Sequence, residues 1–147
     1  MISKILVAMD GSESSLRAYE YASFLAKQCN AALLIVNIFD AFERISSKIK
    51  QELGEVAKQI EAEGGTAITL QMLDDYKSQA KDSGIKDVKT LIRQGNAAAE
   101  ILHIADEEKA DTIVIGSTGI NTLKEFLLGG VSHKMIHHAK CPVTIVR

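Results

Sequence analysis

The chain has few of the residues that mark specialised protein classes. It contains no tryptophan, one proline, two cysteines and 5% aromatic residues among its 147 residues. Cys29 and Cys141 lie far apart and form neither a CxxC redox pair nor a zinc-ligand pattern. We therefore expect two reduced, buried thiols, as in a reducing cytoplasm, and no disulfide or metal framework.

A surplus of charge and a long apolar run are also missing. The 17 basic and 19 acidic residues give a net charge of −2, which does not favour binding to nucleic acid or to an anionic membrane. The apolar run between Lys4 and Asp10 is too short for a signal peptide, and no run approaches the ~18 residues of a membrane helix. We expect a soluble, cytoplasmic protein, with residues 1–147 forming a single domain.

Strand and helix patterns alternate along the sequence. Short apolar runs bounded by turn residues predict five strands, over Lys4–Met9, Ala32–Phe39, Val88–Ile92, Thr112–Ile115 and Val143–Val146. Right-handed crossovers between such strands give a parallel sheet with helices on both faces. The sequence therefore predicts a doubly wound, Rossmann-like α/β domain with the strand order 3-2-1-4-5.

Helical periodicity fills the intervals between these strands. After a cap at Ser12, one stripe is formed by Leu16, Tyr19, Ala22, Ala26 and Cys29. Asn96 caps a second predicted helix, and another covers Val131–Ala139. Residues 42–83 are also helical in pattern and end at Gly84, and either one broken helix or two helices folded back fit this segment.

Four of the ten glycines fall between Gly116 and Gly130, directly after the fourth predicted strand. Ligands bind outside the carboxyl ends of parallel strands, and glycines there let backbone N–H groups approach one anion. The helix that begins near Gly130 adds its unpaired donors and the positive end of its dipole. The cluster predicts a phosphate site built from backbone, with hydroxyl donors from Ser117, Thr118 and Ser132. It matches neither the Walker pattern nor the dinucleotide fingerprint.

The spacing Gly116-x2-Gly119-x9-Gly129, followed by Val131 and Ser132, resembles the ATP-binding signature of the universal stress protein family. The resemblance extends over the chain, from the Asp-Gly-Ser that follows the first strand to the closing Cys-Pro-Val-Thr-Ile-Val-Arg. It implies a protein that binds ATP or AMP, with Mg²⁺ as a further candidate, and that has a regulatory or protective role in stress.

The resemblance also implies roles for individual residues. Asp10, which by itself predicts an Asx turn, would accept hydrogen bonds from the ribose hydroxyls. Ala8 and Met9 would border the base, and Ile38 would meet adenine through its backbone and side chain. The ribose and phosphates would be approached by Ile115, Gly116, Ser117, Thr118 and Gly119, and the phosphate tail by Gly129, Gly130, Val131 and Ser132. Gly130 stands where the family usually has Ser or Thr, which removes one neutral hydrogen bond worth ~1 kcal/mol.

Binding, rather than catalysis, is the predicted activity. Phosphoryl transfer needs an in-line nucleophile and carboxylate ligands for Mg²⁺, and the loop contains only Glu125 as an acidic residue, so no catalytic residue is assigned. A slow ATP hydrolase is one alternative. A dimeric scaffold with a degenerate nucleotide site is another, since Gly130 departs from the family pattern.

Two further patterns concern partners and metals. The last strand, Val143–Arg147, lies at an edge of the predicted sheet and has no internal charge, which predicts pairing with a second copy; the resemblance implies the same homodimer. His133 and His137 have the i, i+4 spacing of zinc sites, but no Glu follows the first histidine and no third ligand is evident. We therefore expect a solvated helix face and no metal.

Overall fold

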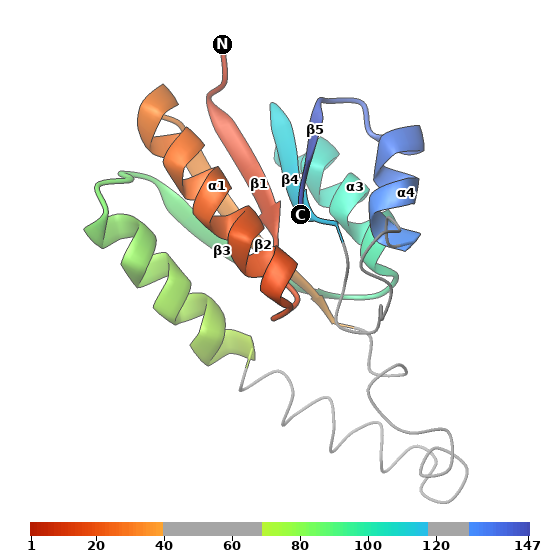
Figure 1. Ribbon diagram of the computed structural model, residues 1–147, viewed down its shortest axis with the longest axis horizontal. Coiled ribbons are helices and arrows are strands. Elements are labelled where there is room, and N and C mark those ends of the chain that lie inside the picture. The colour runs from red at the N-terminus through yellow and green to blue at the C-terminus, as the bar shows by residue number, and fades with distance from the viewer. Residues whose placement is uncertain (40–68, 118–129) are drawn as a thin grey trace, which may run out of the picture.

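The computed structural model describes residues 1–39, 69–117 and 130–147, and this part of the chain contains one parallel five-stranded sheet (Figure 1). Its strands are β1 (Lys4–Ala8), β2 (Ala32–Phe39), β3 (Val88–Gln94), β4 (Thr112–Gly116) and β5 (Val143–Val146). They lie in the order β3-β2-β1-β4-β5, and every neighbouring pair is parallel. The predicted doubly wound α/β fold and its strand order are confirmed.

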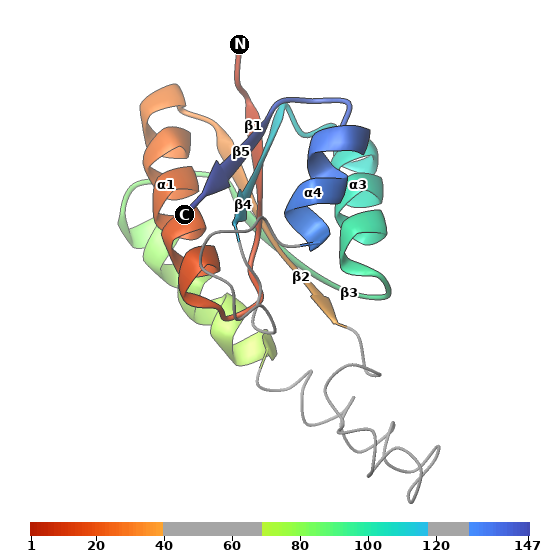
Figure 2. The same ribbon diagram turned by 45° about the vertical axis from the view of Figure 1, so that its right-hand side comes forward.

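Helices cover both faces of this sheet. One face carries α1 (Glu13–Cys29) together with helical residues 69–82, and the other carries α3 (Ala97–Glu107) and α4 (Gly130–His138) (Figure 2). The predicted helical segment 42–83 is described only from residue 69. Whether it is one helix or two therefore concerns residues outside the described ranges.

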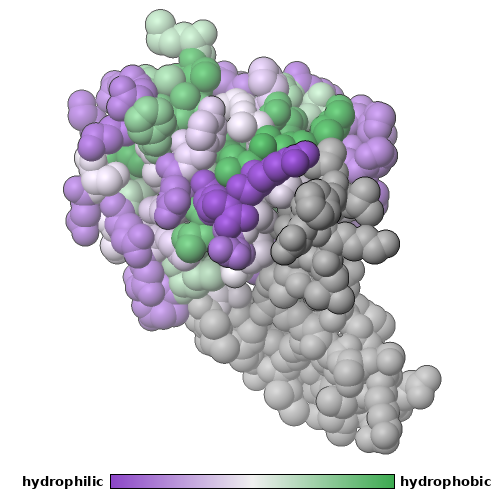
Figure 3. Space-filling view, in the orientation of Figure 1, coloured by the Kyte–Doolittle hydropathy of each residue, from purple (hydrophilic) through white to green (hydrophobic). Residues whose placement is uncertain are grey.

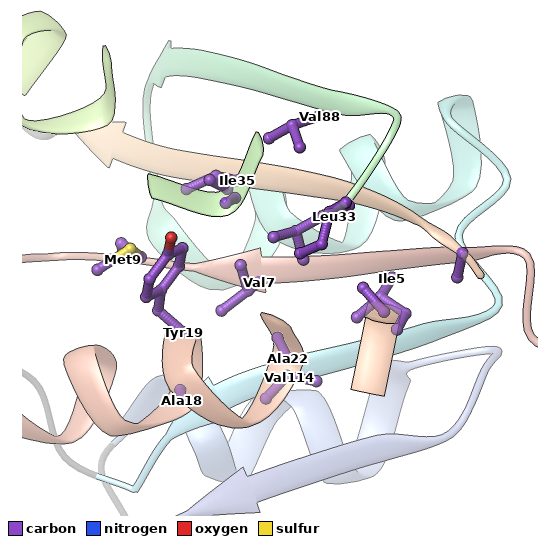
Figure 4. Close-up of a cluster of buried hydrophobic side chains, with 14 of the residues drawn as sticks. Ile5, Val7, Met9, Ala18, Tyr19, Ala22, Leu33, Ile35, Val88 and Val114 are labelled. Atoms are coloured by element: carbon purple, nitrogen blue, oxygen red, sulfur yellow. The ribbon is translucent and has the colours of Figure 1, made fainter. Parts of the chain in front are cut away.

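The sheet divides the core into two layers because successive strand residues point to opposite faces. In β1, Ile5 and Val7 pack beneath α1, whereas Leu6 packs beneath α3. Figure 4 shows the first layer, in which Tyr19 and Ala22 of α1 lie over the strands. Each fully buried aliphatic side chain contributes about 1.5–3 kcal/mol, so these continuous apolar runs fix the fold.

Helix ends follow the predicted capping residues. The Ser12 hydroxyl accepts a hydrogen bond from the Ser15 N–H (3.2 Å), and the Asn96 side chain accepts one from the Ala99 N–H (3.1 Å). Gly84 closes the 69–82 helix with a φ of 105°, a conformation that L side chains rarely adopt. The caps at Ser12 and Asn96 and the stop at Gly84 are confirmed.

Two expectations about buried residues are wrong. Cys29 is exposed because it lies in the last turn of α1, beyond Ala26, and Cys141 is partly exposed in the connection between α4 and β5. Leu16 is 37% exposed because the buried face of α1 is narrow and is centred on small residues, among them Ala18.

Asp111 joins the amino ends of β1 and β4. Its Oδ2 accepts hydrogen bonds from the Ser3 N–H (2.8 Å), the Ser3 hydroxyl (2.7 Å) and the Lys4 N–H (2.8 Å). These donors, led by the Ser3 hydroxyl, favour the carboxylate and lower the pKa of Asp111 to about 2. The ionised form of this one side chain therefore contributes to the folded state.

This contact predicts a pH dependence of stability. Because the pKa of Asp111 is lower in the folded than in the unfolded protein, its contribution is present above the unfolded pKa and is lost as pH falls toward about 2. In urea unfolding from pH 6 to pH 2.5, Asp111→Asn is expected to flatten this loss. Asp82→Asn, which removes an exposed carboxylate with no hydrogen bond to the described residues, is the control for the loss of one carboxylate. Equal slopes for wild type and Asp111→Asn would contradict the assignment.

Candidate functional site

The candidate site lies at the carboxyl edge of the sheet, between β1 and β4. The chain leaves β1 toward β2 by way of α1 and leaves β4 toward β5 by way of α4, so the two connections diverge on opposite faces (Figure 2). Such a switch point is where doubly wound sheets form a ligand crevice. Asp10 follows β1 and Ser117 follows β4, so the two residues border this crevice.

Asp10 forms the turn that leads from β1 into α1. Its Oδ1 accepts a hydrogen bond from the Ser12 N–H (2.8 Å), and Gly11 between them has a φ of 84°. The predicted Asx turn is therefore present. Within residues 1–39, 69–117 and 130–147, the other carboxylate oxygen of Asp10 has no hydrogen-bond partner. One oxygen shapes the turn, and the second remains able to accept hydroxyl donors.

The peptide groups of β2 alternate in direction at this edge. The Met9 N–H donates to the Val36 oxygen (2.8 Å), so even-numbered residues of β2 face β1, whereas the Gly95 N–H donates to the Phe39 oxygen (3.0 Å) on the β3 side. Ile38 therefore directs its N–H and C=O toward β1, but β1 has already ended. No hydrogen bond joins either group to any part of the chain described by the structure. A free donor and a free acceptor lie side by side.

Asn37 is a functional candidate that the sequence analysis missed. Its Nδ2 donates to the Met9 oxygen (2.6 Å), while its buried Oδ1 has no hydrogen-bond partner among the described residues. The residue is only 2% exposed, and a buried, unpaired acceptor costs about 1–3 kcal/mol. The signal was in the sequence, since Asn37 is the only polar residue in the run Ala32–Phe39.

Gly116 lies against the first turn of α1. A Cβ atom there would come within 2.4 Å of Ser14 Oγ, 2.7 Å of the Ser14 carbonyl carbon and 2.8 Å of the Ser15 nitrogen. These distances are too short for any side chain, because backbone atoms cannot move aside cheaply. Gly116 is therefore required by the packing of β4 on α1, a reason that spacing along the sequence did not reveal.

Ser132 fastens the start of α4 to the end of β4. Ser132 is 2% exposed, and its hydroxyl donates to the carbonyl oxygens of Gly116 (3.0 Å) and Ser117 (3.2 Å). The proton predicted to reach a phosphate is thus shared between two backbone acceptors. The donors that α4 offers at its start are its unpaired backbone N–H groups. Among the described residues, a Cβ at Gly130 would meet nothing within 4 Å.

The other residues assigned from the sequence are placed as follows. Ala8 and Val131 are partly buried against the α3 face, and the side chain of Ile115 is buried there. Thr118, Gly119 and Gly129 lie outside the described residues, as does Glu125. The structure therefore brings Asp10, Ser117 and the first residues of α4 to the same edge, and it leaves the central part of the glycine loop undescribed.

His133 and His137 are exposed on α4, with ring centroids 4.7 Å apart. In the described ranges, no group of three or more His, Cys, Asp or Glu side chains is arranged to hold a metal ion. The described helices also include none that is both long and apolar enough to cross a membrane.

The glycine loop, the Asp10 turn and the strand order agree with one known family. The sequence profile of the universal stress protein family matches residues 1–147. The chain belongs to the universal stress protein family. It is 36% identical to universal stress protein YxiE of Bacillus subtilis over 154 aligned positions, which cover 100% of both chains.

Two solved structures extend the comparison. A protein described as hypothetical protein MJ0577 is 27% identical, has a TM-score of 0.80, and is matched over 99% of this chain and 96% of its own. A universal stress protein solved in complex with cAMP is 28% identical, with a TM-score of 0.72, over 99% of this chain and 97% of its own. The doubly wound architecture is therefore shared with members of the universal stress protein family.

Proposed function

We propose that this universal stress protein is a cytoplasmic regulatory or protective protein that binds an adenine nucleotide, ATP or AMP, at the carboxyl edge between β1 and β4. The open peptide group of Ile38 carries the proposal. Adenine presents a hydrogen-bond acceptor at N1 beside a donor at N6, and the N–H and C=O of Ile38 form the complementary pair. A universal stress protein of known structure was solved in complex with cAMP, which has the same base.

The remaining contacts follow from the polar groups at this edge. The second carboxylate oxygen of Asp10 accepts charge-assisted hydrogen bonds from the ribose hydroxyls. The unpaired N–H groups at the start of α4 bind the phosphates, assisted by the helix dipole, and Gly119 and Gly129 belong to the same loop. Mg²⁺ would accompany ATP through the phosphate oxygens, because no described carboxylate cluster binds it independently.

Calorimetric titration tests this function. The protein, freed of copurifying ligand by unfolding and refolding, is titrated with AMP, ATP and GMP. We expect saturable binding of the adenine nucleotides and weaker binding of GMP, whose base offers a donor at N1 and an acceptor at O6. Binding of none of the three at millimolar concentration would rule out the proposed function and would favour a scaffold with a degenerate site.

We further propose that a second copy of this chain pairs with β5. All four β5 residues are partly exposed, and the strand forms an edge of the sheet. Beside it, Arg17 of α1 donates from Nε to the Arg147 oxygen (2.7 Å), and Tyr21 and Phe24 follow on the same helix face, 42% and 61% exposed. Hydrophobic surface also gathers on the side of the molecule where β5 lies (Figure 3). An unpaired edge and an adjoining apolar surface support a symmetric dimer.

One substitution tests the free edge of β5 without removing a hydrogen bond between β4 and β5. The carbonyls of Pro142 and Val146 bond to β4, so the N–H of Ile145 points to the free edge. Ile145→Pro removes that donor, and we expect light scattering to show a shift from dimer to monomer. Ile145→Val, which trims the same side chain but keeps the N–H, should remain dimeric. A wild-type protein that is monomeric at tens of micromolar would contradict the dimer.

A further inference from the structure

The ladder between β1 and β2 stops one hydrogen bond early. The last bond joins the Met9 N–H to the Val36 oxygen, and the next in the series would join the Ile38 N–H to the Met9 oxygen. The Met9 oxygen instead accepts a hydrogen bond from Asn37 Nδ2 at 2.6 Å, and within the described residues it accepts none from the Ile38 N–H, although a carbonyl oxygen has two lone pairs. The side chain of Asn37 therefore donates to the Met9 oxygen where the backbone N–H of Ile38 would otherwise do so.

We propose that Asn37 is a positioning residue that holds this ladder open, so that the N–H and C=O of Ile38 remain available to read the base of the nucleotide. The inference rests on the proposed function for its ligand, but not for its geometry. Asn37 lies on the same face of the sheet as Ile35 and Met9, in the layer beneath α1, and it acts through the Met9 carbonyl rather than by touching the base.

The choice of residue supports this role. Position 37 is almost fully buried in a run of apolar residues, where leucine would fill a similar volume and leave no polar atom unpaired. Asparagine instead leaves Oδ1 without a partner among the residues that the structure describes. A stability requirement alone selects against this arrangement, so an amide donor aimed at the Met9 oxygen is consistent with a functional requirement at this edge.

The first experiment needs no ligand. Amide hydrogen exchange, followed by NMR, is measured at Ile38 in the wild type and in Asn37→Leu. In the wild type, the Ile38 N–H is expected to exchange at least ~10-fold faster than the ladder amides of β2, because no group of the described residues accepts its hydrogen bond. In Asn37→Leu the Met9 oxygen becomes free, the Ile38 N–H bonds to it, and exchange at Ile38 is expected to slow by a similar factor.

Three further variants control this experiment. Asn37→Ala repeats the test in case the leucine variant does not fold. Asn37→His retains an N–H donor on the side chain and should keep Ile38 in fast exchange. Phe39→Leu changes a buried residue on the same strand without touching the Met9 oxygen, and it should leave the exchange rate at Ile38 unchanged.

The second experiment measures base selectivity by titration with AMP, IMP and ribose 5-phosphate. IMP has a donor at N1 and an acceptor at O6, the reverse of AMP, so the wild type is expected to prefer AMP by ~10-fold or more. Asn37→Leu should lose this preference and keep its affinity for ribose 5-phosphate, whereas Asn37→His should restore the preference. A general loss of structure would instead lower all three affinities together.

The outcomes separate this inference from the proposed function. An Ile38 N–H as protected in the wild type as its ladder neighbours would overturn the inference, as would an unchanged preference for AMP in Asn37→Leu. If the exchange rates behave as expected but the wild type binds neither AMP nor ribose 5-phosphate, the nucleotide function fails. The opening of the ladder by Asn37 would then stand, without its assigned ligand.

Discussion

Replacing Gly116 with alanine is expected to lower the free energy of unfolding by about 3 kcal/mol, at the upper end for an overpacked site. The added methyl group would approach the Ser14 hydroxyl oxygen at 2.4 Å and two backbone atoms of α1 at 2.7 and 2.8 Å. Relief would require β4 and the first turn of α1 to separate, which would also move Asp10 away from Ser117. Urea unfolding monitored by circular dichroism measures the change.

Gly130→Ala is the matched control for this substitution. Gly130 begins α4, and a Cβ atom there would meet no atom of the described residues within 4 Å. Alanine is the better helix former, so the change in stability is expected to stay within about 1 kcal/mol and to be favourable if it is detectable. Equal losses in Gly116→Ala and Gly130→Ala would contradict the view that Gly116 is required by packing.

Asp10→Ala is expected to weaken the binding of AMP or ATP by ~10- to 100-fold. The carboxylate accepts hydrogen bonds from the ribose hydroxyls in the proposed complex, and hydrogen bonds to a charged group are worth about 1.5–3 kcal/mol. Because Oδ1 also holds the Ser12 N–H, the same variant should lose some stability. Titration calorimetry and urea unfolding measure the two effects separately.

Asp10→Asn separates the turn from the ribose contact. The amide oxygen still accepts the Ser12 N–H, so the turn and the stability of the protein should be preserved. The second carboxylate oxygen is replaced by a donor, so nucleotide affinity should still fall. An asparagine variant with wild-type affinity would assign Asp10 to the turn alone.

The fold could be predicted from the sequence because strand patterns and helix caps depend on residues that are close together along the chain. Short apolar runs bounded by turn residues predicted β1 to β5. Ser12, Asn96 and Gly84 marked helix ends where the structure has them. Small displacements occur at element ends. β1 ends at Ala8, although Met9 keeps one ladder bond, and α4 begins at Gly130. The strand order followed from the general rule for doubly wound sheets.

The details of the candidate site depended on contacts between distant segments. Gly116 and Ser132 were both predicted as phosphate ligands, yet the structure shows one required by packing on α1 and the other donating to the carbonyls at the end of β4. The sequence around each residue does not predict which distant backbone atoms that residue contacts. Asn37 stood out in the sequence as the one polar residue of the run Ala32–Phe39, but its contact with the Met9 oxygen depends on where β1 ends beside β2.

The most direct test of nucleotide binding is the thermal unfolding midpoint of ligand-free protein with and without millimolar AMP or ATP. A ligand present at 100 times its dissociation constant adds ~2.7 kcal/mol, which for a domain of this size raises the midpoint by ~5–10 °C. We predict a rise of this order with either nucleotide, greatly reduced in Asp10→Asn. A midpoint that neither AMP nor ATP changes would contradict the proposed function.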